Sequence, residues 1–133
     1  MQGLHLTADL RDCRCDSAWL LNASQLGSAC RSAVREAGLQ VVNEVFHTFP
    51  HSVHGPGGVT ATLLLAESHL CVHTWPEQRA VTLDVYVCNF GGDHSAKAQA
   101  LMDALLGLFM PQHTERHALQ RGALAISSSA AHE

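Results

Sequence analysis

The sequence predicts an α+β fold, a two-layer sandwich in which helices cover one face of an antiparallel sheet. Short runs rich in Val, Leu and Thr follow one another with tight connections, and only two segments have the apolar spacing of a helix. A parallel sheet would need more helices, because each crossover between parallel strands requires one. The 133 residues, 47% of them hydrophobic, suffice for one compact domain with a modest core, which we assign to residues 1–122.

The first predicted elements are a strand and a helix. Apolar and polar side chains alternate over residues 4–10, the period of a half-buried strand. Over residues 24–37 the apolar side chains recur at steps of three and four, and Gly38 follows, which predicts one amphipathic helix. Four further strands are predicted, each bounded by Gly or Pro: residues 40–49, 59–66, 69–74 and 80–88.

A second helix is predicted after these strands. Either Asp93 or Ser95 would cap its start, and its apolar face runs to Phe109. Pro111 ends the helix, and we interpret the segment that follows as a loop. Residues 123–133 are small, polar and without period, which predicts a flexible tail.

Composition and charge exclude several classes of function. The net charge is −4 and the 8 Lys and Arg residues are scattered, so no basic stripe for nucleic acid is expected. We find no apolar run of membrane-spanning length and no signal-peptide pattern, and we expect a cytoplasmic protein without membrane contact. Free thiols are expected there, because the spacing of the cysteines is unpaired. These are Cys13, Cys15, Cys30, Cys71 and Cys88.

The densest polar segment spans residues 66–77, with two histidines, a serine, a cysteine and two acids. A strand there would carry its reactive side chains on one face and its core side chains on the other. The reactive face would hold Glu67, His69, Cys71, His73 and Trp75.

Three interpretations of this face are open from composition. His69, Cys71 and His73 could bind a metal, but no second Cys/His pair at knuckle spacing accompanies them, so no metal site is expected. The pair His113 and His117 falls in the predicted loop. Alternatively the histidines are ordinary core or surface residues, or Ser68 is a nucleophile with a base nearby. Composition does not choose between these last two.

One resemblance bears on that choice. The string ESHLCVHTWPE is similar to the signature ESHLxIHTWPE of the prokaryotic S-adenosylmethionine decarboxylases, which are pyruvoyl-dependent. Four more segments occur in the order of that family: GLHLTADLRDC, VFHTF, PGGVTA and LDVYVCN. The resemblance covers residues 4–122 and supports the nucleophile interpretation of Ser68.

The resemblance implies a self-processing enzyme. The chain would cut itself between Glu67 and Ser68 into a β chain of residues 1–67 and an α chain of residues 68–133. Ser68 would become a pyruvoyl group that forms a Schiff base with the substrate amine. No pyridoxal phosphate and no metal would then be needed.

Roles for five further residues are implied in the same way. His73 matches the processing residue, and Thr60 stands where the family usually has a processing serine. Cys88 matches the proton donor, since a thiol is mostly protonated at neutral pH. Phe49 would contact the adenine, and Glu77 would form hydrogen bonds in the substrate pocket.

The implied reaction converts S-adenosylmethionine to its decarboxylated form, the aminopropyl donor of spermidine biosynthesis. The implied assembly is a homodimer of processed protomers, with active sites at or near the subunit contact. A sheet face without helices is consistent with this, because such a face must be polar or meet another sheet.

Departures from the family pattern keep two alternatives open. The Tyr-Gly-Tyr turn after Glu77 and the Gly after Cys88 are missing, and residues 50–55 are additional. A pyruvoyl-dependent ornithine or arginine decarboxylase could instead use Glu77 or Asp84 to hold a cationic side chain. The other alternative is a non-processing partner subunit, against which the joint presence of the implied site residues argues.

Overall fold

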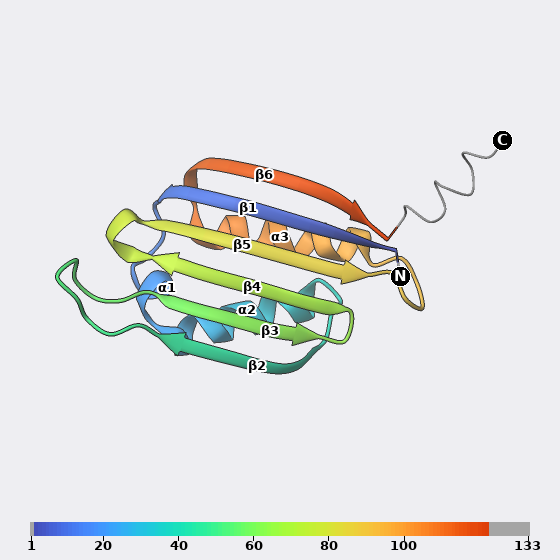
Figure 1. Cartoon of the computed structure of the whole chain (residues 1–133), viewed down its shortest axis with the longest axis horizontal. Helices are drawn as coiled ribbons and strands as arrows, with labels where there is room; N and C mark the ends of the chain where they lie inside the picture. Colours follow the sequence, from blue (N-terminus) through green and yellow to red (C-terminus); the bar gives the residue numbers. More distant parts are fainter. Residues whose placement is uncertain (1, 123–133) are drawn as a thin grey trace.

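The computed structural model describes residues 2–122 and shows a six-stranded antiparallel sheet in the order β2-β3-β4-β5-β1-β6. The strands are β1 (Gly3–Cys13), β2 (Val41–Thr48), β3 (Val59–Leu65), β4 (Ser68–Trp75), β5 (Ala80–Cys88) and β6 (Pro111–Arg121). The helices are α1 (Ala18–Leu21), α2 (Ala23–Glu36) and α3 (Ser95–Phe109), with a 3-10 turn η1 (Pro76–Gln78). All three α-helices lie behind the sheet, and its other face is open (Figure 1). This confirms the predicted two-layer class.

The core lies between the sheet and the two long helices. Alternate residues of β5 are fully buried while their neighbours are half-buried, the pattern of a strand covered on one face. One face of α3 packs against β5 and β1, and α2 packs against β2. The buried residues of α3 recur at helical spacing: Ala98, Leu101, Met102, Leu105 and Phe109.

The predicted first strand, both long helices and the four middle strands are confirmed, with ends shifted by a few residues. Asn22 caps α2, accepting a hydrogen bond from the Gln25 N–H at 3.0 Å. The predicted cap of α3 is wrong, because His94 holds the N-cap position without a side-chain cap bond. Asp93 instead accepts from the Ser95 N–H at 2.9 Å, closing a local turn before the helix.

The predicted loop after Pro111 is also wrong, because this segment is the edge strand β6, paired along its length with β1. Only its first residue is half-buried and the rest are exposed. No apolar alternation could therefore mark it in the sequence. In a strand, His113 and His117 are about 13 Å apart, so they do not form a helical metal-binding pair.

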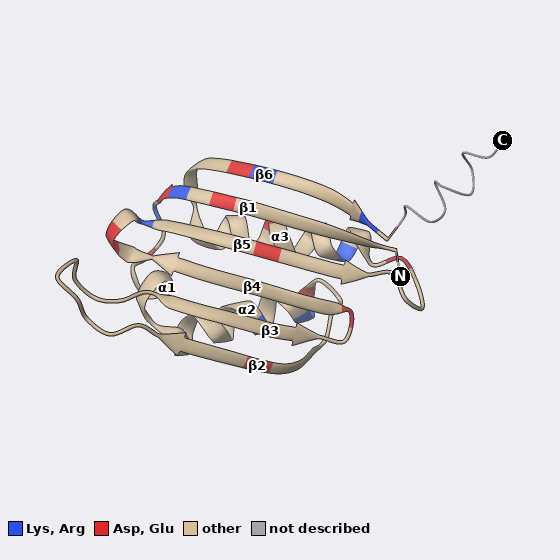
Figure 2. Ribbon diagram, viewed as in Figure 1, with Lys and Arg blue, Asp and Glu red and all other residues tan. Residues whose placement is uncertain are grey.

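The charges of the described residues are spread thinly, as Figure 2 shows, and residues 2–122 carry no continuous basic stripe. No helix among these residues is long and apolar enough to cross a membrane. The predicted flexible tail, residues 123–133, lies outside the described part of the chain.

The open face, the sheet face without helices, carries the alternate side chains of every strand. On β4 these are His69, Cys71, His73 and Trp75, as predicted, and the residues between them are buried. Glu67, which was predicted on the same face, instead lies in the turn before β4. The face also has exposed apolar side chains on β2, β3 and β6. These are Val45, Leu64 and Leu119, with 70%, 47% and 59% of their surface exposed.

We expect Thr74→Val to lower the free energy of unfolding by about 1–3 kcal/mol, because two buried backbone groups would lose their partner. The Thr74 hydroxyl accepts from the Val59 N–H and donates to the Leu20 carbonyl, both at 2.8 Å. Urea unfolding measures the effect, with Thr82→Val at a half-buried position of β5 as control. Equal stability of the two variants would contradict this role of the hydroxyl.

Candidate active site

A two-residue turn joins β3 to β4 and sets the backbone of Ser68 in an unusual conformation. Leu65 and Ser68 face each other in register on either side of the turn. The φ angle of Ser68 is 156°, in a region that glycine occupies almost alone. Backbone held there by its surroundings stores about 1–3 kcal/mol of strain. The peptide bond before Ser68 is therefore next to a strained residue.

The carbonyl of that peptide bond, on Glu67, has a well-placed donor. The Cys88 N–H, at the end of β5, donates to the Glu67 carbonyl oxygen at 2.8 Å. The Glu67 side chain accepts from the Gln40 N–H at 3.3 Å, and the Ala66 N–H donates to the Gln40 carbonyl at 2.8 Å. The turn is thus held from both sides, and its Glu67 carbonyl is polarised.

This arrangement suits an attack of the Ser68 hydroxyl on the carbonyl of Glu67. The carbonyl oxygen would gain negative charge during such an attack, and the Cys88 N–H already points at it. Cleavage of the bond would release the strain at Ser68. The residues present therefore fit a serine that is converted into a new chain end.

The Cys88 side chain lies on the open face at the same end of the sheet. Its thiol is half-buried, whereas burial raises the pKa of the Cys30 thiol to about 12 and that of the Cys13 thiol to about 11. Those two buried thiols therefore stay protonated at neutral pH. Opposite Cys88 stands Gly3, where an added Cβ would lie 2.5 Å from the Val87 carbonyl oxygen. Only glycine lets β1 approach β5 so closely there.

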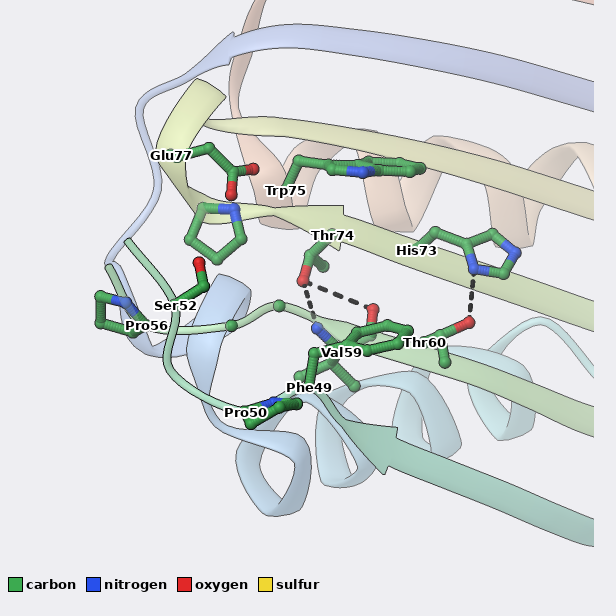
Figure 3. Close-up of a pocket in the computed structure, with 13 residues that line it drawn as sticks. Phe49, Pro50, Ser52, Pro56, Val59, Thr60, His73, Thr74, Trp75 and Glu77 are labelled. Carbon is green, nitrogen blue, oxygen red and sulfur yellow. Dashed lines mark hydrogen bonds between the residues drawn. The ribbon is translucent and has the colours of Figure 1, made fainter. Parts of the chain in front are cut away.

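A cavity of about 470 Å³ opens at the other end of β4. Aromatic, hydroxyl, imidazole and carboxylate side chains line it (Figure 3). Among them are Phe49, Thr60, His73, Trp75 and Glu77. The size is that of a pocket for a small organic ligand.

Two of these side chains are joined directly. Thr60 and His73 face each other on β3 and β4, with 2.5 Å between Thr60 Oγ1 and His73 Nδ1. Trp75 has 41% of its surface exposed and lines the cavity next to His73. Its ring is available to a ligand.

Phe49 is held at the rim by the loop that follows β2. The Phe49 N–H donates to the Gly58 carbonyl at 2.9 Å, and at Gly57 an added Cβ would lie 2.1 Å from the Phe49 carbonyl oxygen. With 48% of its surface exposed, the Phe49 side chain is not part of the core. The additional residues 50–55 contribute Pro50 and Ser52 to the cavity wall.

Glu77 lies in the 3-10 turn η1, whose end is shaped by Arg79. Arg79 stands where the family pattern has glycine, and its φ of 48° is left-handed. Its guanidinium donates to the Cys13 carbonyl at 2.6 Å and to the Cys15 carbonyl. These bonds offset the strain that glycine would avoid, and they keep the turn below Glu77 in place.

The predicted site residues form two groups at opposite ends of the sheet. Glu67 and Ser68 lie where β4 begins and Cys88 lies where β5 ends, at the right-hand end of the sheet in Figure 1. The cavity is lined by residues of the β2–β3 loop and of η1, which follow the other end of β4. Ser68 and His73 are five positions apart on β4, which is about 17 Å along the strand. A single chain therefore does not bring the two groups together.

One cluster on the open face was not predicted as a unit. Asp84 Oδ1 lies 2.5 Å from His5 Nε2 and 3.5 Å from His69 Nε2. The strand pattern placed each residue on a polar face, but only the pairing of β1 with β5 brings His5 beside Asp84. The potential metal ligands that meet in this part of the structure are these three, rather than His69, Cys71 and His73.

Comparisons with known proteins agree with one another. The family model described as S-adenosylmethionine decarboxylase matches residues 4–122. The S-adenosylmethionine decarboxylase proenzyme of Persephonella marina is 33% identical, over 98% of this chain and 90% of that protein. That of Parasynechococcus marenigrum is 37% identical, over 90% and 83%. The crystal structure of the adenosylmethionine decarboxylase from Aquifex aeolicus superposes with a TM-score of 0.77 at 32% identity, covering 90% of each chain.

Proposed function

Given that this chain belongs to the S-adenosylmethionine decarboxylase family, we propose that it cuts itself before Ser68 and then decarboxylates S-adenosylmethionine. The observation that carries the proposal is the strained Ser68 beside a Glu67 carbonyl that accepts from the Cys88 N–H. The products of processing are residues 1–67 and 68–133, and Ser68 becomes a pyruvoyl group. The five free thiols fit the reducing cytoplasmic compartment expected from the sequence.

The pyruvoyl group supplies an electron-withdrawing ketone and amide, which accept the electrons released when carbon dioxide leaves. Side chains carry out proton donation and assist the processing of the chain. Cys88 ends the strand next to the turn that holds Ser68, and it offers its thiol on the open face as the proton donor. In processing, the Thr60 hydroxyl and the His73 imidazole act as a hydrogen-bonded pair.

The cavity suits an adenosyl group better than a small amino acid. The exposed rings of Phe49 and Trp75 offer faces for stacking, and Glu77 offers a carboxylate to ribose hydroxyls. In the alternative reaction, Asp84 would hold a cationic side chain, but its carboxylate is engaged with His5. The names of the relatives also favour S-adenosylmethionine over ornithine or arginine.

We further propose that the working unit is a homodimer with composite active sites. Two open faces can pack together about a two-fold axis that lies between them, perpendicular to β4. Such an axis puts the Ser68 end of one protomer over the cavity of its partner, and the reverse, giving two equivalent sites. The exposed apolar side chains of the open face, Val45, Leu64 and Leu119, would be covered in the same step.

Carboxyl-labelled substrates test the reaction. We expect the purified, processed protein to release labelled carbon dioxide from S-adenosylmethionine, and not from ornithine or arginine supplied in parallel. Ser68→Ala should abolish both chain cleavage and release, because no ketone can form. Release from an amino acid alone would overturn the substrate assignment.

Cys88→Ala separates the backbone of Cys88 from its side chain. We expect chain cleavage to persist, because the N–H that donates to the Glu67 carbonyl remains. Turnover should fall about 10²-fold or more, since the proton donor is lost. Steady-state kinetics on the cleaved protein measures this, with Cys71→Ala on the same face as control. Unchanged turnover would remove Cys88 from the mechanism.

Mixed dimers test the composite site. A Ser68→Ala chain lacks the ketone but has an intact cavity. A Glu77→Ala chain has the ketone but lacks a carboxylate of the cavity. Co-expression should restore about a quarter of wild-type activity, because half of randomly formed dimers contain one complete site of two. If each chain held its whole site, the mixture would be no more active than the two variants alone.

A further inference from the structure

We propose that His69 is the base that removes a proton from the α-ammonium group of the substrate, and that Asp84 and His5 position it. This rests on the proposed function and adds to it. An amine must be unprotonated to attack a ketone, whereas the α-amine of an amino acid is mostly protonated at neutral pH. The roles assigned above to Cys88 and to the pair of Thr60 and His73 leave this proton without an acceptor.

The position of His69 suits the task. It directly follows Ser68, so its Cα is about 3.8 Å from the carbon that becomes the ketone. Its side chain lies half-buried on the open face, the face that carries the Cys88 thiol. His69 is thus the titratable side chain nearest in sequence to the reacting carbon on the α chain.

Two neighbours, Tyr86 and Arg121, hold the cluster of His5, Asp84 and His69 in place. Tyr86 faces His69 on one side and His5 on the other in the register of β4, β5 and β1. The ring centroid of Tyr86 lies 5.8 Å from that of His69 and 5.6 Å from that of His5. The two imidazoles meet edge to face at 6.4 Å. Arg121 stacks over the Tyr86 ring at 5.0 Å.

Arg121 also fixes the proton on His5. Its Nη1 lies 3.3 Å from His5 Nδ1, and a guanidinium only donates, so Nδ1 must accept. The proton of neutral His5 is then on Nε2, which donates to Asp84 at 2.5 Å. The carboxylate of Asp84 therefore accepts from His5 and faces His69 on β4. Figure 2 shows one acidic band within β5, and Asp84 is the only acid of that strand.

The carboxylate of Asp84 in turn orients His69. Its Oδ1 is 3.5 Å from His69 Nε2, so it favours a proton on Nε2 and leaves the lone pair of Nδ1 free. The nearby negative charge stabilises the imidazolium that forms when Nδ1 takes a proton, as the aspartate of a catalytic triad does. Separations of this length often shorten when substrate binds.

The step balances as a proton cycle. His69 Nδ1 takes a proton from the ammonium group, and the freed electron pair of the nitrogen forms a bond to the ketone carbon of residue 68. The carbon–oxygen bond then breaks. The oxygen leaves as water with one proton from the nitrogen and the one that His69 returns, so His69 ends neutral.

The same three side chains have the composition of a divalent-metal site, with their donor atoms within 4.8 Å of one another. A metal would need the Nε2 lone pair of His5. The contact with Arg121 places the proton on that nitrogen instead. A hydrogen-bonded base therefore explains the contact between Arg121 and His5, whereas a metal site does not.

Two amines of different basicity test the proposal on processed protein. Phenylhydrazine has an unprotonated nitrogen at neutral pH and needs no base, whereas S-adenosylmethionine does. In His69→Gln we expect phenylhydrazine labelling of residue 68, followed by mass, to stay within about twofold of wild type. Borohydride trapping of S-adenosylmethionine on residue 68 should slow about 10²-fold. His113→Gln, in an exposed pair with Asp12, is the matched control and should change neither rate.

Asp84→Asn should slow substrate trapping about tenfold and leave phenylhydrazine labelling unchanged, as expected for a positioning residue. This variant leaves residues 67–69 unchanged, so it decides the question if His69→Gln fails to process. Equal trapping rates in wild type and Asp84→Asn, or equal loss of both reactions, would overturn the proposal. Failure of wild type to react with phenylhydrazine would instead contradict the pyruvoyl group itself.

Discussion

The hydrogen bond from the Cys88 N–H to the Glu67 carbonyl ties the start of β4 to the end of β5, and the chemistry is arranged around it. It holds a carbonyl beside a serine whose backbone is strained, with φ at 156°. The same strand end presents the Cys88 thiol on the open face. In the proposed reaction, this one backbone contact connects the making of the ketone to its later use.

The rigid sheet also keeps the Ser68 end and the cavity of one chain about 17 Å apart, so they cannot form one site within that chain. No hinge in β4 could close that distance without breaking its pairing with β3 and β5. The proposed homodimer would bring the two ends together by symmetry, because a two-fold axis exchanges them. The uncovered face, with its exposed Val45 and Leu64, would then be the contact between the two copies.

Much of this architecture could be predicted from local sequence patterns. Strand alternation placed His69 and His73 on one face and Thr74 in the core. The edge strand β6 could not be predicted, because its side chains are exposed and only its backbone pairs with β1. The cluster of His5, Asp84 and His69 depends on which strands are neighbours. No single segment contains that information, and family motifs name residues without saying which ends of the sheet they occupy.

We propose above all that Ser68 becomes a ketone at the head of a new chain. Borohydride reduction of the purified protein in the presence of an amine, followed by mass measurement of the fragments, tests this most directly. We expect a 68–133 fragment carrying the reduced amine adduct on its first residue. An intact 14.3 kDa chain with no adduct would contradict it.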